Sequence, residues 1–297
     1  MNKALQKTGK IVTYLILIAI SLFFFFPLLW TFGTSMKPPS EYYSTPPTIL
    51  PRDPTIVHYI EAFIPWQLER MEETRRYWVE EAAGRAHPIT PSIKNSLIVT
   101  FLSVMLSLLI GIPSSYALAR YKFRGSDNIA FWILSVRMLP PIVAAIPIFL
   151  IVNSLGLVDT YPGLIIPYIM LNLPFVVWMM KGFISDIPIE IEEAAQIDGC
   201  SRFSSFLRVT LPLCIGGIVA TALFCVFITW NEFLFAVILT RTNVQTLTVN
   251  LSTFRLDRGI LWGMMSATIT VAVLPLLFLT FFFQKQLVKG LTAGAIK

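Results

Sequence analysis

Few residues in this sequence have the type and spacing that catalysis or metal binding requires. The three cysteines, Cys200, Cys214 and Cys225, match no metal or redox pattern, and His58 and His87 stand apart from each other. The sequence contains no G-x4-G-K-[ST] phosphate loop, no H-E-x-x-H pair and no nucleophile elbow. It therefore predicts neither an enzyme nor a metal site.

The composition is that of a membrane protein. Of 297 residues, 55% are hydrophobic and 13% are charged, against about 25% charged in soluble domains. The apolar residues come in blocks of about 20, the length that crosses roughly 30 Å of hydrocarbon as a helix. This excludes a soluble enzyme, a disordered chain and a disulfide-stapled secreted domain. The net charge of +6 indicates basic loops at the inner face of a membrane, and we expect no nucleic-acid binding.

Six spans are predicted from these blocks. They cover Ile11–Phe32, Leu97–Leu118, Ile129–Val152, Pro162–Phe183, Leu213–Leu239 and Leu261–Phe283. The first follows three lysines, as a signal peptide would, but it is too long and no small-residue cleavage site follows it, so we expect a retained helix. Prolines within the spans predict bent helices, which membrane proteins tolerate where neighbouring groups satisfy the freed carbonyls.

Basic residues orient the spans. One side carries Lys3, Lys7, Lys10, Arg120, Lys122, Arg124, Lys181, Arg202, Arg208, Lys285, Lys289 and Lys297, whereas the short loops opposite offer only Arg241, Arg255 and Arg258. The positive-inside bias therefore places both termini and the loops 120–128 and 184–212 in the cytoplasm. The long segment 33–96 is then external.

This external segment has two parts. A proline-rich part over 36–58 predicts an extended, irregular chain. Residues Trp66–Arg85 predict a helix with opposite charges at i,i+4 spacing, either a solvated surface helix or a docking surface for an external partner.

The loop 184–212 is too polar to span a membrane. Pro188, followed by Glu190 and other acids, matches the N-terminus of a helix. Gly199 predicts its end in a left-handed conformation, and Ser201 can cap a second helix. The prediction is helix–Gly–helix, with two alanines that leave one face shallow.

This loop resembles the EAA loop of ABC-importer permeases, E-A-A-x3-G-x9-I-x-L-P. Glu193-Ala194-Ala195, Gly199, Val209 and Leu211-Pro212 match at these offsets, with Val209 in place of Ile the only departure. A second stretch, Glu80-Glu81-Ala82-Ala83-Gly84, begins alike but lacks the later positions and lies on the predicted outer side. We interpret it as a chance likeness.

Three further stretches resemble the carbohydrate-type importers, specifically the maltose-permease G-like subunit. They are Arg137-Met138-Leu139-Pro140-Pro141, Trp230-Asn231-Glu232-Phe233 and the tail from Gly290 to Lys297. The similarity covers most of 11–35 and 92–297, and residues 60–90 read as an insertion.

The resemblance implies an all-α integral membrane protein: one transmembrane domain over 1–297 with six helices, a cytoplasmic coupling loop at 184–212, an external helical insertion and a cytoplasmic tail at 285–297. It implies a prokaryotic cell membrane, a second homologous permease, two ATPase subunits that bind ATP and Mg, an extracytoplasmic solute-binding protein and a carbohydrate substrate. The implied ATPase-coupling residues are Glu192, Glu193, Ala194, Ala195, Asp198, Gly199, Leu211 and Pro212, with tail contacts from Gly290, Thr292, Gly294 and Lys297. The chain itself is expected to hold no cofactor.

Candidates for the substrate pathway are Arg137, Asn172, Trp230, Asn231 and Glu232. Near mid-membrane, Arg137 either pairs with helix-end carbonyls or faces the pathway, and Asn172 either joins two helices or contacts a sugar hydroxyl. Trp230 and Glu232 lie near the outer interface, where an aromatic belt, a gate and a contact with the binding protein are the alternatives.

The competing hypothesis is an ion-coupled secondary carrier. Proton-coupled carriers usually need several buried titratable groups in the membrane, and Glu232 is the one acid within a predicted span. The sequence does not indicate which sugar would be carried.

Overall fold

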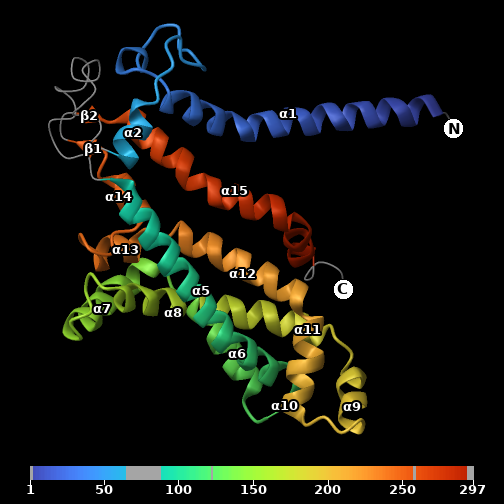
Figure 1. The fold of residues 1–297 in the computed structure, drawn as a ribbon. Coiled ribbons are helices and arrows are strands. Elements are labelled where there is room, and N and C mark those ends of the chain that lie inside the picture. The colour runs from blue at the N-terminus through green and yellow to red at the C-terminus, as the bar shows by residue number, and fades with distance from the viewer. Residues whose placement is uncertain (1–2, 65–87, 122, 257–258, 293–297) are drawn as a thin grey trace. The chain divides into compact units, whose positions relative to one another are not determined.

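A computed structural model describes residues 3–64, 88–121, 123–256 and 259–292. Within these ranges the regular secondary structure is helical, apart from two short antiparallel strands, β1 (Arg255–Leu256) and β2 (Gly259–Ile260). The chain divides into two compact units, one of residues 1–90 and 250–274 and one of residues 91–249 and 275–297. The predicted all-α class is confirmed (Figure 1).

The helices have the following bounds in chain order. They are α1 (Lys3–Ser35), the 3-10 turn η1 (Pro39–Glu41), α2 (Val57–Phe63), α5 (Ile89–Arg120), α6 (Ser126–Val136), α7 (Pro141–Ser154), α8 (Tyr161–Ser185), α9 (Ile189–Ile197), α10 (Arg202–Ser205), the π turn η2 (Phe206–Thr210), α11 (Leu211–Leu213), α12 (Ile215–Trp230), α13 (Leu234–Leu239), α14 (Leu247–Ser252) and α15 (Trp262–Thr292).

Four predicted spans are confirmed as single helices. Apolar segments long enough to cross a membrane occur in α1, α5, α8 and α15, and the described residues give six spans if each of two bent helix pairs is counted as one. In the segments Lys10–Ser35 and Trp262–Val288 only 0% and 17% of the most apolar stretch is buried, whereas in α5 and α8 the share is 44% and 56%. Such a surface requires lipid or another apolar partner.

The span predicted over Ile129–Val152, with a bend at its prolines, is a sharply bent pair of helices in the structure. The chain bends by 92° between α6 and α7. Pro140 occupies the N-cap of α7 in a non-helical conformation and Pro141 its first position. Neither proline has an N–H to donate, and Pro141 disfavours a helical conformation at Pro140 before it, so the adjacent pair ends the helix here.

The span predicted over Leu213–Leu239 is interrupted in the structure. The main helix, α12, begins at Ile215, bent by 72° from the preceding stretch Arg202–Leu213. It ends at Trp230, and the short α13 begins only at Leu234. No proline or glycine lies between the two helices to mark this break.

In the first unit, the predicted irregular part contains η1 and turns around a buried histidine. The Nε2 atom of His58 lies 2.9 Å from the Tyr42 hydroxyl and 2.9 Å from the Lys37 carbonyl. Burial lowers the pKa of His58 to about 4, against the bond with the Lys37 carbonyl, which raises it. The predicted helix Trp66–Arg85, most of the insertion 60–90 and the second Glu-Ala-Ala stretch lie outside the described residues.

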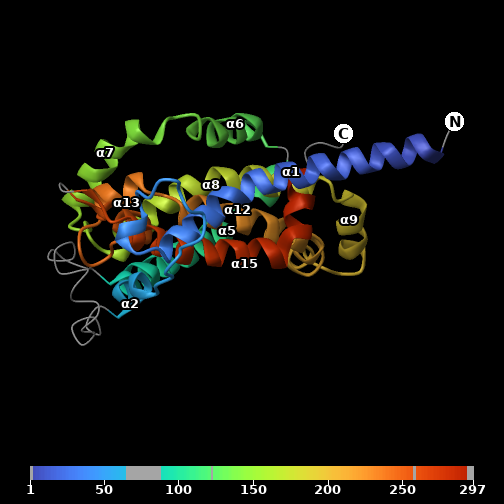
Figure 2. The same cartoon turned by 90° about the horizontal axis from the view of Figure 1, so that it is seen from above.

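The second unit packs α5, α8 and α12 side by side, with α13 at one end and α9 at the other (Figure 2). One apolar cluster joins α5, α7, α8 and α13, and another joins α5, α8, η2 and α12. Glycine permits the closest approach: a Cβ at Gly111 of α5 would lie 2.5 Å from Val176 Cγ1 of α8. Both α5 and α8 extend from the end of this unit that holds α13 to the end that holds α9 and η2.

Candidate functional site

The predicted helix–Gly–helix loop is present. Pro188 is the N-cap of α9, and Gly199 follows α9 with φ of +92°, in open space where a Cβ would have no neighbour within 4 Å. The hydroxyl of Ser201 caps α10 by accepting from the Ser204 N–H at 3.2 Å. The left-handed glycine and the serine cap fix the turn between the two helices.

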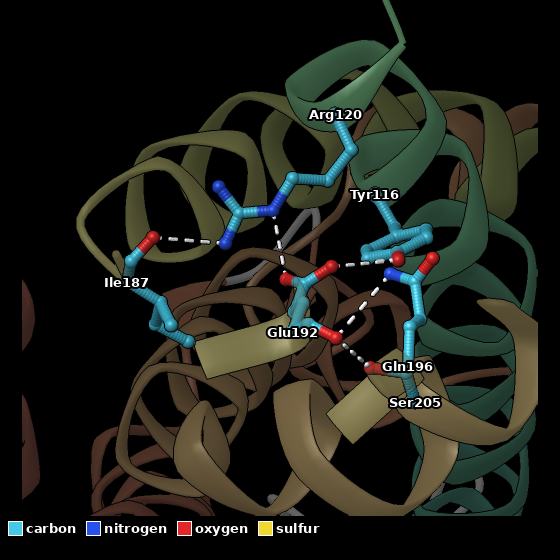
Figure 3. Close-up of polar contacts among 6 residues, drawn as sticks. All are labelled: Tyr116, Arg120, Ile187, Glu192, Gln196 and Ser205. Carbon is cyan, nitrogen blue, oxygen red and sulfur yellow. Dashed lines mark hydrogen bonds and ion pairs between the residues drawn. The ribbon is translucent and has the colours of Figure 1, made fainter. Parts of the chain in front are cut away.

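Glu192 is buried at the centre of the loop (Figure 3). Its Oε1 lies 2.8 Å from Arg120 Nε, and its Oε2 accepts from the Tyr116 hydroxyl at 2.8 Å. Both partners belong to the last turns of α5. A carboxylate that is 3% exposed is costly unless it is paired and hydrogen-bonded, and here both oxygens are occupied.

Arg120 connects the same carboxylate to the chain before α9. Its Nη2 donates to the Ile187 carbonyl at 2.9 Å. On the other side, Gln196 Nε2 and Ser205 Oγ donate to the Glu192 carbonyl at 3.3 and 3.5 Å (Figure 3). The end of α5, the turn before α9, α9 itself and α10 thus meet in one polar cluster.

The neighbouring Glu193 lies on the exposed side of α9, with Ala194 and Asp198. Apolar side chains share this exposure: Ile197 is 86% and Phe203 70% exposed. Sequence reasoning grouped the two adjacent glutamates. The structure separates them because consecutive helical residues point about 100° apart.

The other predicted coupling residues are spread over two regions. Leu211 packs against the apolar cluster of α5, α8 and α12, and Pro212 beside it is exposed. Gly290 and Thr292 lie in the last turns of α15, whereas Gly294 and Lys297 fall outside the described residues. The π turn η2 between α10 and α11 was not predicted, and its sequence carries no distinct signal for one.

Arg137 is the C-cap of α6, at the break before α7. It is exposed, and its guanidinium carbon lies 4.8 Å from the centroid of the Phe175 ring in α8. Among the described residues, the Arg137 guanidinium contacts the face of an aromatic ring, which attracts a cation, and it bonds to no helix-end carbonyl.

Asn172 is fully buried. Its Nδ2 donates to Thr229 Oγ1 at 2.8 Å, which joins α8 to α12. This bond favours the interpretation of Asn172 as a link between two helices.

The stretch Trp230 to Glu232 forms the break between α12 and α13. Trp230 is only 7% exposed, so the aromatic-belt interpretation is wrong. Asn231 Nδ2 donates to the Phe227 carbonyl at 2.8 Å and closes the end of α12.

Glu232 caps the next helix with its carboxylate. Oε1 accepts from the Phe235 N–H at 2.9 Å, and Oε2 accepts from the Ala236 N–H at 3.1 Å and the Tyr168 hydroxyl at 2.7 Å. Carboxylates are favoured at helix N-termini. An acid directly before a short apolar segment is the sequence signal that could have predicted this role.

Sequence reasoning missed the residues that hold the loop 241–247. Asp159 accepts from the backbone N–H groups of residues 241 to 244 at 2.9–3.3 Å. Burial alone would raise the pKa of Asp159. The four hydrogen bonds lower this pKa by more than burial raises it, so the pKa lies below its ordinary value. From α5, Asn95 Nδ2 donates to the carbonyls of Asn243 and Gln245, and Ser96 Oγ accepts from the Leu247 N–H.

Comparison with known proteins identifies the chain. The family described as "Binding-protein-dependent transport system inner membrane component" matches residues 87–293. The chain belongs to this family. The permease is 34% identical to the diacetylchitobiose uptake system permease DasC of Streptomyces coelicolor, over 92% of this chain and 91% of DasC. It is 34% identical to the trehalose/maltose transport system permease MalG of Thermococcus litoralis, over 69% of this chain and 74% of MalG.

A solved structure shares the fold of this permease. A chain of a bacterial ABC transporter involved in the import of alginate matches 96% of the permease and 98% of its own length, with a TM-score of 0.72 and 20% identity. The predicted resemblance to ABC-importer permeases is therefore confirmed. The family is a membrane component of a transport system, which supports the importer and not the ion-coupled carrier.

Proposed function

We propose that this permease forms half of the translocation pathway of an importer for a carbohydrate. Two relatives that match more than two thirds of the chain are named for diacetylchitobiose and for trehalose and maltose. The other half would come from a second homologous permease, with a solute-binding protein delivering the sugar. Two ATPase subunits would bind ATP and Mg, because this sequence has no phosphate loop.

The exposed face of α9 and α10 is the surface that we assign to the ATPase contact. It combines the acids Glu193 and Asp198 with the apolar side chains Ile197 and Phe203. A partner cleft with apolar walls and a cation would match both, since a charge-assisted bond adds orientation to apolar contact. The observation that carries the proposal is that buried Glu192 anchors the loop from behind while this face stays free of the described chain's core.

The decisive experiment reconstitutes the importer with its ATPases and binding protein and compares two glycines. Gly199 and Gly156 both have positive φ, and neither has any atom within 4 Å of a Cβ position. Valine at either costs roughly 1 kcal/mol or more of backbone strain, but only Gly199 orients the proposed contact surface. We expect Gly199→Val to abolish binding-protein-stimulated ATP hydrolysis and uptake, and Gly156→Val to retain both. Equal activity of the two variants would overturn the coupling assignment.

A charge reversal tests the same surface. Glu193→Lys is expected to weaken recovery of the ATPase with the permease at least tenfold, because it places a cation against the proposed cationic partner. Asp127→Lys is the matched control, since Asp127 is an exposed acid in the first turn of α6. Recovery that falls equally in both variants would indicate a general charge effect and contradict the proposal.

For the substrate pathway we retain Arg137 as the best supported candidate, because its guanidinium is exposed at the break between two helices. Arg137→Met should raise the sugar concentration needed for half-maximal uptake while stimulated ATP hydrolysis persists. The break between α12 and α13 is proposed to be shaped by Trp230, Asn231 and Glu232. Asn172 is proposed to join α8 to α12. All four residues would affect the pathway only by positioning these helices.

The proposed topology places both termini and the coupling loop in the cytoplasm of the cell that carries this permease. In a variant whose three cysteines are replaced by alanine, a single cysteine at Asp186, which is exposed at the start of the loop 184–212 and outside the proposed contact surface, should react with an impermeant thiol reagent only after permeabilisation. Labelling in intact cells would reverse the orientation.

A further inference from the structure

The cytoplasmic-loop end of α5 is attached to α9 by side chains alone. Arg120 and Tyr116 both bind the Glu192 carboxylate at 2.8 Å. Aromatic contact adds to this, because the Tyr116 ring lies 4.6 Å from the Phe206 ring, just after α10. This group of contacts, here named the Glu192 clamp, consists of Tyr116, Arg120, Glu192 and Phe206.

The other end of α5 is attached to the loop 241–247, again by side chains. Asn95 Nδ2 donates at 3.0 and 3.1 Å to two carbonyls of the loop, and its Oδ1 accepts from the Tyr161 hydroxyl at 2.7 Å. Ser96 Oγ accepts from the Leu247 N–H at 2.8 Å and is 4% exposed. We name Asn95, Ser96 and their loop partners the Asn95 clamp.

Between the clamps α5 is one uninterrupted helix. It has 32 residues, which corresponds to roughly 48 Å at 1.5 Å per residue. It remains helical through Pro113 and contacts α8 closely at Gly111. A packed helix resists compression, so displacement of one end moves the other.

The chain path gives α5 a distinct position. The coupling loop is continuous with α8 before it and with α12 after it, so a pull on the loop reaches these two helices through covalent bonds. In sequence α5 is separated from the loop by α6, α7 and α8. Among the described residues, α5 is linked to the loop by the Glu192 clamp, by the hydrogen bond from Arg120 to the Ile187 carbonyl and by apolar contacts.

We propose that α5 carries movement of the coupling loop to the loop 241–247 through the Glu192 clamp and the Asn95 clamp. Arg120, Tyr116, Asn95 and Ser96 are then positioning residues for energy coupling. The proposal rests on the proposed coupling role of the loop. The proposal adds a route for the movement that does not pass through α8 or α12, the helices covalently continuous with that loop.

The test uses the complete importer with an environment-sensitive fluorophore at Asp186, at the start of the loop 184–212, or at Thr242, both exposed, in the cysteine-free permease. In the parent, ATP should change the signal at both sites. In Tyr116→Phe, and in Arg120→Gln combined with Glu192→Gln, the change at Asp186 should persist while that at Thr242 falls at least fivefold. Asn95→Ala should do the same from the other end. Ser114→Ala is the control, because its hydroxyl returns to Ile110 of the same helix.

A double variant tests whether the two clamps lie on one route for the movement or on two separate routes. If the clamps act in series, Tyr116→Phe with Asn95→Ala should lower the Thr242 response no further than the stronger single variant. Unchanged responses in all assembled variants, or effects that multiply in the double variant, would overturn the proposal. If Thr242 loses its response but Gly199→Val couples normally, the proposed function fails instead, because then the loop is not the contact that drives the movement.

Discussion

Two carboxylates in the second unit, Glu192 and Glu232, solve the same physical problem differently. Glu192 lies within α9 and Glu232 lies between α12 and α13, and each accepts from a tyrosine hydroxyl and anchors a short helical segment. Glu192 is neutralised by the guanidinium of Arg120, whereas Glu232 receives two backbone N–H groups of α13. One therefore depends on a particular distant side chain, and the other mostly on the backbone that follows it.

This difference indicates which connection evolution and mutation can break most easily. The two N–H donors belong to the backbone of α13 and are present whenever α13 is folded, so a side-chain substitution in α13 does not remove them. Both partners of a buried ion pair are side chains, and loss of one by substitution leaves the other charge buried without compensation. The coupling end should therefore be fragile to single changes and the α12–α13 break tolerant of them.

The largest effect is expected for Arg120→Met. It leaves the Glu192 carboxylate buried and uncompensated, at a cost of about 3–5 kcal/mol. The measurement is the free energy of unfolding of the purified permease in mixed micelles. Adding Glu192→Met should recover most of this loss, since an apolar pair of similar volume removes both charges. A double variant as unstable as the single one would show that the charge was not the cause.

At the second carboxylate, Glu232→Ala should cost about 1–2 kcal/mol, the usual loss of a helix cap. Tyr168→Phe, which removes only one hydroxyl, should cost about 1 kcal/mol. The same unfolding assay serves for both. A loss at Glu232 as large as that for Arg120→Met would remove the contrast between the two sites.

Asn172 offers an uncharged reference, with a smaller expected effect than at either carboxylate. Asn172→Leu and Thr229→Val each remove the hydrogen bond between Asn172 of α8 and Thr229 of α12, and each should cost about 0.6 kcal/mol. Uptake per assembled complex is expected to stay within twofold of the parent. A loss of uptake in Asn172→Leu alone, with complexes and basal ATP hydrolysis intact, would return Asn172 to the substrate pathway.

The smallest effect is expected at Asp159, and it should depend on pH. Its pKa is lowered in the folded protein by backbone donors of the loop 241–247, so its stabilisation is complete above its ordinary pKa of about 3.9 and is lost as pH falls through the lowered value. Asp159→Asn should therefore be less stable than the parent at neutral pH, and the gap should narrow on acidification below about pH 4. A gap that widens on acidification would contradict this sign.

Much of this arrangement could be predicted from the sequence. Four spans, the turn at Gly199 and the cap at Ser201 follow from local hydrophobicity, glycine conformation and serine capping. The bend at Pro140 was signalled by its two prolines, although we expected a kink and not a break of 92°.

The rest depends on contacts between distant residues. Nothing local distinguishes Glu192 from Glu193, because the difference is which of them faces Arg120 from α5. The same holds for Asn95 and Asp159, which bind a loop about 80 to 150 residues away in sequence. Sequence periodicity describes one element at a time and does not indicate which elements meet.

The separation of Arg120 and Glu192 has a consequence for biogenesis. They are 72 residues apart, and ribosomes add about 5–20 residues per second, so Arg120 waits roughly 4–14 s before its partner is made. During that interval its long side chain keeps the charge at the water boundary. The end of α5 that α9 binds is thus already present when α9 is made.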